Sequence, residues 1–149
     1  MADLVHGADT DVMRWVAERI EHIDAEEALP FGPFRAIGVV VDRALVAGCV
    51  YHNFVPRYGT CEISFAAESP RWATRGTIRA LLSVPFLQWG CHRVQMVTSL
   101  ANERAIRLIR GIGFTREGTH AHAFGPGKHA VSFRLLRRDF DRLFMRRPS

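Results

Sequence analysis

The 149-residue sequence has no apolar run that approaches the ~20 residues required by a membrane-spanning helix. Its N-terminus lacks the charged and then apolar pattern of a signal peptide. It also contains no Walker motif, no dinucleotide-binding glycine fingerprint and no Ser-His-Asp order, and we find no internal repeat or low-complexity linker. These absences argue against a membrane-spanning or secreted protein and predict a cytoplasmic one.

Cysteine is scarce. The three cysteines, Cys49, Cys61 and Cys91, are widely spaced, and each lies within an apolar or strand-like segment. An odd number at such spacing does not suggest a disulfide framework. We therefore expect reduced, buried thiols, which suit a cytoplasmic protein.

Lysine is nearly absent, since Lys128 is the one lysine among 20 basic residues. This bias resembles genome composition more than selection for phosphate contacts, so a nucleic-acid partner is not expected, although an arginine-rich nucleic-acid binder stays an alternative. The formal net charge of +5 would equally suit a polyanionic cofactor. The basic residues cluster only near the C-terminus, at Arg134, Arg137, Arg138, Arg142, Arg146 and Arg147, where Asp139 and Asp141 interrupt them.

The hydrophobic content of 48% and the charged content of 23% predict one globular domain over residues 1–149. Thr10 is a candidate N-cap for an amphipathic helix over residues 11–23. Apolar runs at 36–41, 45–51 and 61–67 predict three antiparallel strands, and the first two form a hairpin.

A helix should follow the third strand and close at Gly90, with a kink or early stop at Pro85, which removes a backbone donor. Residues 91–118, CHRVQMVTSLANERAIRLIRGIGFTREG, are the most informative part of the chain. They read as a strand, a helix that opens at Asn102, the pair Gly113-Phe114 and a second strand. A last strand is expected over residues 130–136.

The order strand, Asn-x-x-Ala helix, Gly-Phe, strand, Glu-Gly resembles the C-terminal half of the GNAT acyltransferases. The match is closest to the branch that acetylates protein N-termini, such as those of ribosomal proteins, and with the order of elements it covers roughly residues 34–136. The resemblance implies an α+β fold with a mixed, mostly antiparallel sheet flanked by helices on both faces. It also implies acetyl-CoA-dependent transfer of an acetyl group to a primary amine of a small molecule or peptide, and it makes a homodimer possible.

In this family, backbone N–H groups at a helix N-terminus cradle the CoA pyrophosphate in a loop of the form Arg/Gln-x-x-Gly-x-Gly/Ala. The corresponding stretch here, residues 69–77, lacks one expected glycine in either register, and an ordinary strand-to-helix turn is the alternative. Asn102 would contact the pantetheine arm, serve as a helix N-cap, or do both. The cofactor-binding residues implied by the resemblance are Phe65, Ala66, Arg71, Trp72, Ala73, Thr74, Arg75, Gly76 and Asn102, with no metal.

Glu62 is the candidate general base, because Cys61-Glu-Ile-Ser-Phe65 resembles the Glu-Ile-Gly-Tyr strand of the N-terminal-acetylating branch. The alternative is a solvent-facing Glu62 paired with a surface arginine, and Glu68 is a second choice for the base. Many family members carry a tyrosine where Ile109 stands, so the acid must come from elsewhere. Tyr51 is the candidate acid, and the alternatives are Ser132, water or no acid at all.

His120 and His122, with His129, could suggest a metal site, but no nearby carboxylate or cysteine completes a ligand set. A polar strand face is the favoured interpretation. Residues 124–128 form a hairpin turn by composition, and their position would suit a substrate-gating loop. The degenerate phosphate loop and Ile109 keep open a second function, that of a catalytically inactive GNAT-fold binding protein.

Overall fold

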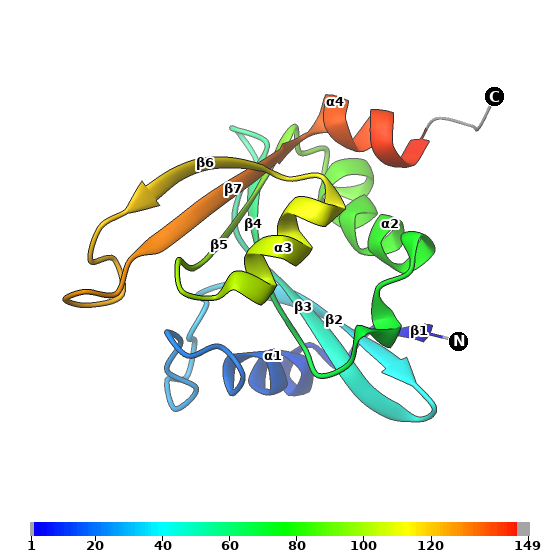
Figure 1. Ribbon diagram of the computed structural model, residues 1–149. Helices are drawn as coiled ribbons and strands as arrows, with labels where there is room; N and C mark the ends of the chain where they lie inside the picture. The colour runs from blue at the N-terminus through cyan, green and yellow to red at the C-terminus, as the bar shows by residue number, and fades with distance from the viewer. Residues whose placement is uncertain (1, 146–149) are drawn as a thin grey trace.

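The computed structural model describes residues 2–145, so Arg146 and Arg147 of the C-terminal arginine cluster lie outside the described part (Figure 1). Seven strands form one sheet in the order β1-β2-β3-β4-β5-β7-β6. All neighbouring strands are antiparallel except β4 and β5. The strands are β1 (Ala2–Val5), β2 (Phe34–Val41), β3 (Ala44–Val55), β4 (Thr60–Ala67), β5 (Arg93–Ser99), β6 (Thr115–His120) and β7 (Ala130–Leu136).

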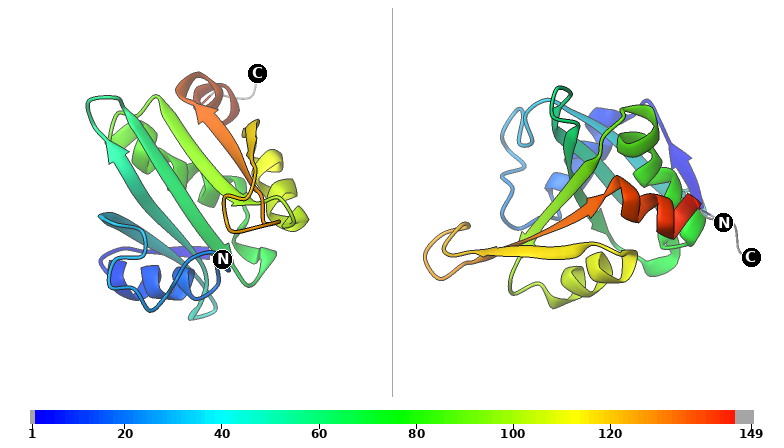
Figure 2. Two further views of the ribbon diagram at one scale, coloured as in Figure 1. Left: turned by 90° about the vertical axis from the view of Figure 1, so that its left-hand side faces the viewer. Right: turned by 90° about the horizontal axis from the view of Figure 1, so that it is seen from above.

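Helices cover both faces of this sheet, as Figures 1 and 2 show. Helix α1 packs on β2, β3 and β4 and closes a smaller core around Val12 and Val50. Helices α2, α3 and α4 enclose the larger core on the opposite face. The α+β class with a mixed, mostly antiparallel sheet is therefore confirmed. The helices are α1 (Asp9–Ala17), α2 (Arg75–Ser83), α3 (Glu103–Ile112) and α4 (Arg137–Phe140), with a 3-10 turn at Pro70–Trp72 and π-helical turns at Val84–Gln88 and Asp141–Met145.

Helix α1 differs from its prediction at both ends. It begins after Ala8, which provides no side-chain cap, and Thr10 lies inside its first turn. It stops at Ala17 instead of near residue 23. The Arg14 guanidinium donates to the carbonyl oxygens of Ala25 and Glu27, both at 2.7 Å, and so draws the following segment back along the helix. If the helix continued to residue 23, residues 25–27 would lie too far along its axis for Arg14 to reach their carbonyl oxygens.

The predicted hairpin and meander are confirmed. Asp42 and Arg43 both take positive φ, which is the backbone twist that a two-residue hairpin turn requires. Gly48 marks a close approach: a Cβ there would lie 2.5 Å from a methyl carbon of Val16 on α1. The glycine therefore lets α1 pack directly on β3.

In the second half of the chain, α2 and β7 also agree with the elements predicted from the sequence. The α2 helix gives way to a π-helical turn that begins one residue before Pro85. Strand β7 spans the predicted residues 130–136. The three cysteines are buried and free, as expected. No helix within residues 2–145 is long and apolar enough to span a membrane.

Candidate active site

The two halves of the sheet meet at β4 and β5, which pair over a short stretch only. The first pair joins Thr60 to Arg93 and the last joins Glu62 to Gln95. Beyond this point the strands separate, and a cleft of about 730 Å³ opens between their C-terminal halves. Strands that stop pairing turn backbone N–H and C=O groups toward the gap, where a ligand can use them.

The cleft is lined from both faces of the sheet. One wall comes from α3 and from the turn after β4, and the other comes from residues 19–22, which directly follow α1. Because α1 and α3 cover opposite faces, the cleft reaches through the sheet. The residues of the first wall include Trp72, Ala73, Asn102, Ala105 and Ile109, and those of the second include Arg19, Glu21 and His22.

Glu62 lies beside the closed end of the cleft: it belongs to the last β4–β5 pair and directly precedes Ile63, the first β4 residue that lines the cleft. Its Oε1 accepts a hydrogen bond from Asn53 Nδ2 at 3.2 Å, and its Oε2 lies 3.7 Å from Nε2 of His52. Burial raises the pKa of the Glu62 carboxyl, and the Asn53 hydrogen bond partly opposes this shift. No arginine within residues 2–145 pairs with Glu62, so the alternative of a surface ion pair is not what the structure shows.

His52 and Ser64 complete a polar cluster with Glu62. His52 is the cross-strand partner of Glu62, and its Nε2 lies 2.8 Å from Oγ of Ser64. Burial lowers the pKa of His52 from 6.5 to about 4, so the ring is neutral at pH 7. The sequence analysis missed both residues. The available signal was the alternation of β4, which puts Ser64 on the same face as Glu62.

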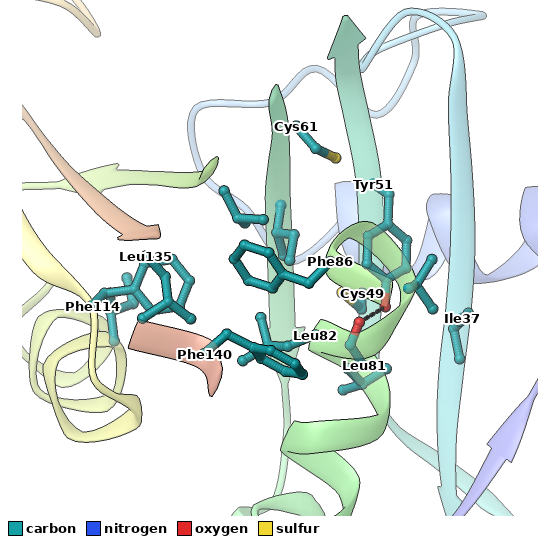
Figure 3. Close-up of a cluster of buried hydrophobic side chains, with 14 of the residues drawn as sticks. Ile37, Cys49, Tyr51, Cys61, Leu81, Leu82, Phe86, Phe114, Leu135 and Phe140 are labelled. Carbon is teal, nitrogen blue, oxygen red and sulfur yellow. Dashed lines mark hydrogen bonds between the residues drawn. The ribbon is translucent and has the colours of Figure 1, made fainter. Parts of the chain in front are cut away.

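Tyr51 is not part of this site, which corrects its prediction as the acid. Its neighbour His52 faces Glu62, so Tyr51 faces the opposite, larger core. The ring is 1% exposed, and its hydroxyl donates to the Leu81 carbonyl at 2.6 Å (Figure 3). Burial holds the pKa of Tyr51 well above its usual value. A phenol in this position cannot reach a leaving group in the cleft.

The predicted phosphate loop lies partly at the cleft. Phe65, Ala66, Trp72 and Ala73 line it, and the Phe65 and Trp72 rings pack together with their centroids 4.3 Å apart. The loop arginines do not line it. Arg71 Nη2 pairs with Asp42 at 2.6 Å, and Arg75 Nη2 donates to the Leu143 carbonyl at 3.0 Å.

The backbone donors of this loop are mostly in use. The N–H groups of Arg71, Ala73 and Thr74 bond to atoms within the loop, and the Thr74 hydroxyl caps α2. Among the described residues, the N–H groups of Arg75 and Gly76 have no such partner, as is usual in a first helical turn. An anion would thus find its free donors at the start of α2.

Asn102 both caps α3 and lines the cleft. Its Oδ1 accepts from the Ala105 N–H at 3.1 Å, so the predicted capping role is confirmed. Its side chain is also part of the cleft wall, which leaves the amide group available for a second contact. Ile109 lies on the same wall, about two helical turns further along, and offers no proton donor there.

The hairpin between β6 and β7 borders a second hollow that adjoins the cleft. Phe124 stacks on His22 with ring centroids 3.9 Å apart, and both residues line this hollow of about 430 Å³. Within the hairpin, Nδ1 of His122 accepts from the Gly127 N–H, and Nδ1 of His129 accepts from the His122 N–H. These histidines therefore shape the loop. Ser132, the alternative acid, is engaged with Nε2 of His120 at 2.9 Å.

The sequence matches no family profile and no curated protein. The structure matches solved acetyltransferases over most of its length. A crystal structure provisionally assigned as an acetyltransferase matches with a TM-score of 0.75 at 16% identity, over 97% of this chain and 87% of its own. Spermidine N-acetyltransferase from Vibrio cholerae, in complex with CoA and spermine, matches with a TM-score of 0.70 at 14% identity, over 93% of this chain and 97% of its own. A dodecameric form of that enzyme gives 0.73 at 13% identity, over 93% and 95%.

The fold is that of the GNAT acetyltransferases. At these identities the likeness shows the GNAT fold and leaves the chemistry to the residues of the cleft. The matched structures do not single out the ribosomal-protein-acetylating branch that the sequence resembles. Within this GNAT fold, the split between β4 and β5 carries Glu62 at its closed end and Asn102 on its wall.

Proposed function

We propose that this chain is an N-acetyltransferase that uses acetyl-CoA to acetylate a primary amine. One observation carries the proposal: a cleft through the sheet ends beside a half-buried carboxylate, and within residues 2–145 that carboxylate has no cationic partner at neutral pH. Such a group can accept a proton from an amine within the cleft. Its raised pKa brings it closer to the neutral range in which a general base is most effective.

The cleft and the start of α2 offer the kinds of contact that a CoA thioester needs. The pantetheine arm would lie along the edge of β4 that no longer pairs with β5, with Asn102 on the wall of the cleft. The pyrophosphate would use the free N–H donors at the start of α2, where the helix dipole favours an anion. Phe65 and Trp72 would give the arm an apolar floor.

The reaction itself needs few groups. Glu62 takes a proton from the attacking amine as nitrogen forms a bond to the carbonyl carbon of the thioester. The carbon–sulfur bond then breaks, its electron pair leaves with sulfur as a thiolate, and the thiolate takes a proton from water. Glu62 returns the amine proton to the hydroxide so formed, which restores the carboxylate. We assign no protein acid to this last step, because Tyr51 is held in the core and Ile109 has no proton to give.

The acceptor is a small-molecule or peptide amine. The solved enzyme in complex with spermine supports polyamines as a first group to test, and the sequence resemblance supports peptide N-termini as a second. The hollow that Phe124 and His22 line adjoins the cleft and would receive the acceptor.

The proposal is tested by thermal unfolding with acetyl-CoA and CoA, followed by thiol-release assays with spermidine, spermine and short peptides. Ligand at ~100 Kd should stabilise the protein by about 2.7 kcal/mol. Glu62→Gln should keep this stabilisation and lose turnover by roughly 10²–10⁴-fold. Full activity of Glu62→Gln would remove Glu62 from the mechanism.

A second candidate, a GNAT-fold protein that binds without catalysis, is favoured by one observation. Most N–H donors of the phosphate loop are bonded internally, so binding there has to compete with those bonds. This candidate predicts a thermal shift with CoA and no thiol release with any amine. The absence of a shift at millimolar ligand would instead count against both candidates.

A further inference from the structure

Three polar side chains meet at the closed end of the cleft, and the proposed reaction uses only one of them. Glu62 and Ser64 project from the same face of β4, and His52 lies opposite on β3. The imidazole touches both: its Nε2 is 2.8 Å from Ser64 Oγ and 3.7 Å from Glu62 Oε2. His52 is itself 6% exposed and is covered by the Phe31 ring, whereas Ser64 lines the cleft.

We propose that Ser64 is a further catalytic residue, which donates its hydroxyl hydrogen to the carbonyl oxygen of the acyl group, and that His52 is the positioning residue that turns this hydroxyl toward the cleft. The inference rests on the proposed function and deepens it. It concerns a group that stabilises charge, and it is separate from the proton acceptor Glu62.

The direction of the hydrogen bond follows from the neighbouring carboxylate. A neutral imidazole carries its hydrogen on one of its two nitrogens. If Nε2 were bare, its lone pair would face Oε2 of Glu62 as well as Ser64, and lone pair and carboxylate repel each other. With the hydrogen on Nε2, the ring donates to Ser64 and gains a favourable interaction with Glu62. Ser64 Oγ is then the acceptor, and its own hydrogen is free.

That free hydrogen can point into the cleft. The side of Ser64 toward β3 is occupied by His52, and the other side borders the cleft. As the amine attacks, negative charge develops on the carbonyl oxygen, and a donor already oriented toward that oxygen stabilises it without reorganising. The electron pair later returns to re-form the carbonyl and expels the thiolate, so Ser64 keeps its proton throughout.

The test combines four variants, Ser64→Ala, His52→Leu, His52→Gln and the double variant His52→Leu with Ser64→Ala. Ser64→Ala should lower kcat by about 10²-fold while the Kd for CoA stays unchanged, because the lost donor acts only in the transition state. His52→Leu should cause a similar loss in the wild-type background and little further loss once Ser64 is alanine. His52→Gln keeps an N–H donor and should recover part of the activity.

Two results would overturn the inference. One is full turnover by Ser64→Ala. The other is a fold-loss in kcat of the double variant that equals the product of the fold-losses of the two single variants. This result would show that His52 does not act through Ser64. A wild-type protein that binds no CoA and releases no thiol would instead refute the proposed function.

A readout without turnover separates the two proposals. Nitrogen-15 NMR of the histidine side chains reports which ring nitrogen carries hydrogen. We expect His52 of the wild-type protein to be the Nε2–H tautomer at pH 7, and Ser64→Ala should shift that resonance. The Nδ1–H tautomer would refute the positioning role even in an inactive protein.

Discussion

His52 links the closed end of the cleft to the stability of the protein. Its pKa falls from 6.5 to about 4 on burial, so the folded protein binds a proton there less readily than the unfolded chain. The contribution of His52 is therefore fully present above pH 6.5 and is lost as the pH falls from 6.5 toward 4.

We expect the free energy of unfolding to fall by roughly 2–3 kcal/mol between pH 7 and pH 4.5 through this residue alone. Urea unfolding at both pH values measures it, and His52→Gln serves as the matched control. The variant should show a smaller pH dependence than the wild-type protein. Equal slopes in the two proteins would mean that His52 titrates normally.

We expect substitution of Tyr51 to change the stability of the protein and to leave its turnover unchanged, which is the opposite of what a catalytic acid would show. Tyr51→Phe removes a hydroxyl that bonds to the Leu81 carbonyl inside the core, so we expect a loss of about 1 kcal/mol in stability. The turnover and its pH profile should not change. Assays of thiol release beside thermal unfolding decide between the two roles, and a large loss of turnover at unchanged stability would restore Tyr51 as the acid.

The contrast between Tyr51 and Glu62 shows where residue-level prediction ends. The sequence identifies both strands, and alternation tells which residues within one strand share a face. It does not tell which residue of β3 lies opposite Glu62, because a shift of one residue exchanges the two faces. The pair turned out to be His52 and Glu62, which puts Tyr51 on the wrong side of the sheet.

At the level of elements, Asn102 has two separable tasks at the start of α3. Asn102→Ala should destabilise the protein by about 1 kcal/mol through loss of the cap and should weaken CoA binding. Asn102→Ser keeps a capping oxygen but has no amide group. If the serine variant restores stability and binding stays weak, the amide contacts the ligand; if both recover, Asn102 is a cap only. Thermal unfolding and CoA titration measure the two effects.

Gly48 tests the packing of α1 on the sheet. In Gly48→Ala the new methyl group would overlap a methyl of Val16, and overpacking of this kind typically costs about 1–3 kcal/mol. Gly111→Ala is the matched control, because Gly111 lies in α3 with open space around its Cβ position. We expect the control to raise the free energy of unfolding by up to about 1 kcal/mol. Urea unfolding compares them, and a neutral Gly48→Ala would mean that α1 shifts easily.

Most elements could be predicted because their signals are local. The Asn102 cap, the Pro85 stop and the apolar run of β7 all lie within the segments that they shape. The end of α1 could not be predicted, because it depends on Arg14 binding carbonyls that come more than ten residues later. The same limit applies to the phosphate loop, whose arginines bind Asp42 and the Leu143 carbonyl in other elements.

At the level of the whole molecule, acetyl-CoA binding should be visible in the sheet. We expect amide hydrogen exchange to slow in residues 63–67 and 96–99, which border the cleft, when acetyl-CoA is added. Residues 60–62, already paired with β5, should change little. Mass spectrometry of peptides from the two strands measures this, and equal protection across the entire sheet would indicate general stabilisation without a defined site.

The high arginine content of the chain bears on the alternative of a nucleic-acid binder. A nucleic-acid binder would show affinity that falls steeply with salt concentration and no competition with CoA. Several arginines are instead engaged within the fold, as in the ion pairs of Arg93 with Glu117 and of Arg137 with Asp141. The cytoplasmic location and the homodimer stay predictions.

The cleft that reaches both faces of the sheet also bears on the order of events during turnover. A thioester that approaches along α3 would leave the α1 face free for an amine, so neither substrate has to depart before the other arrives. Initial velocities measured at several concentrations of both substrates should then give double-reciprocal lines that intersect. Parallel lines would mean that the acyl group is first transferred to the protein. A cleft that is open to both substrates at once does not require such a covalent intermediate.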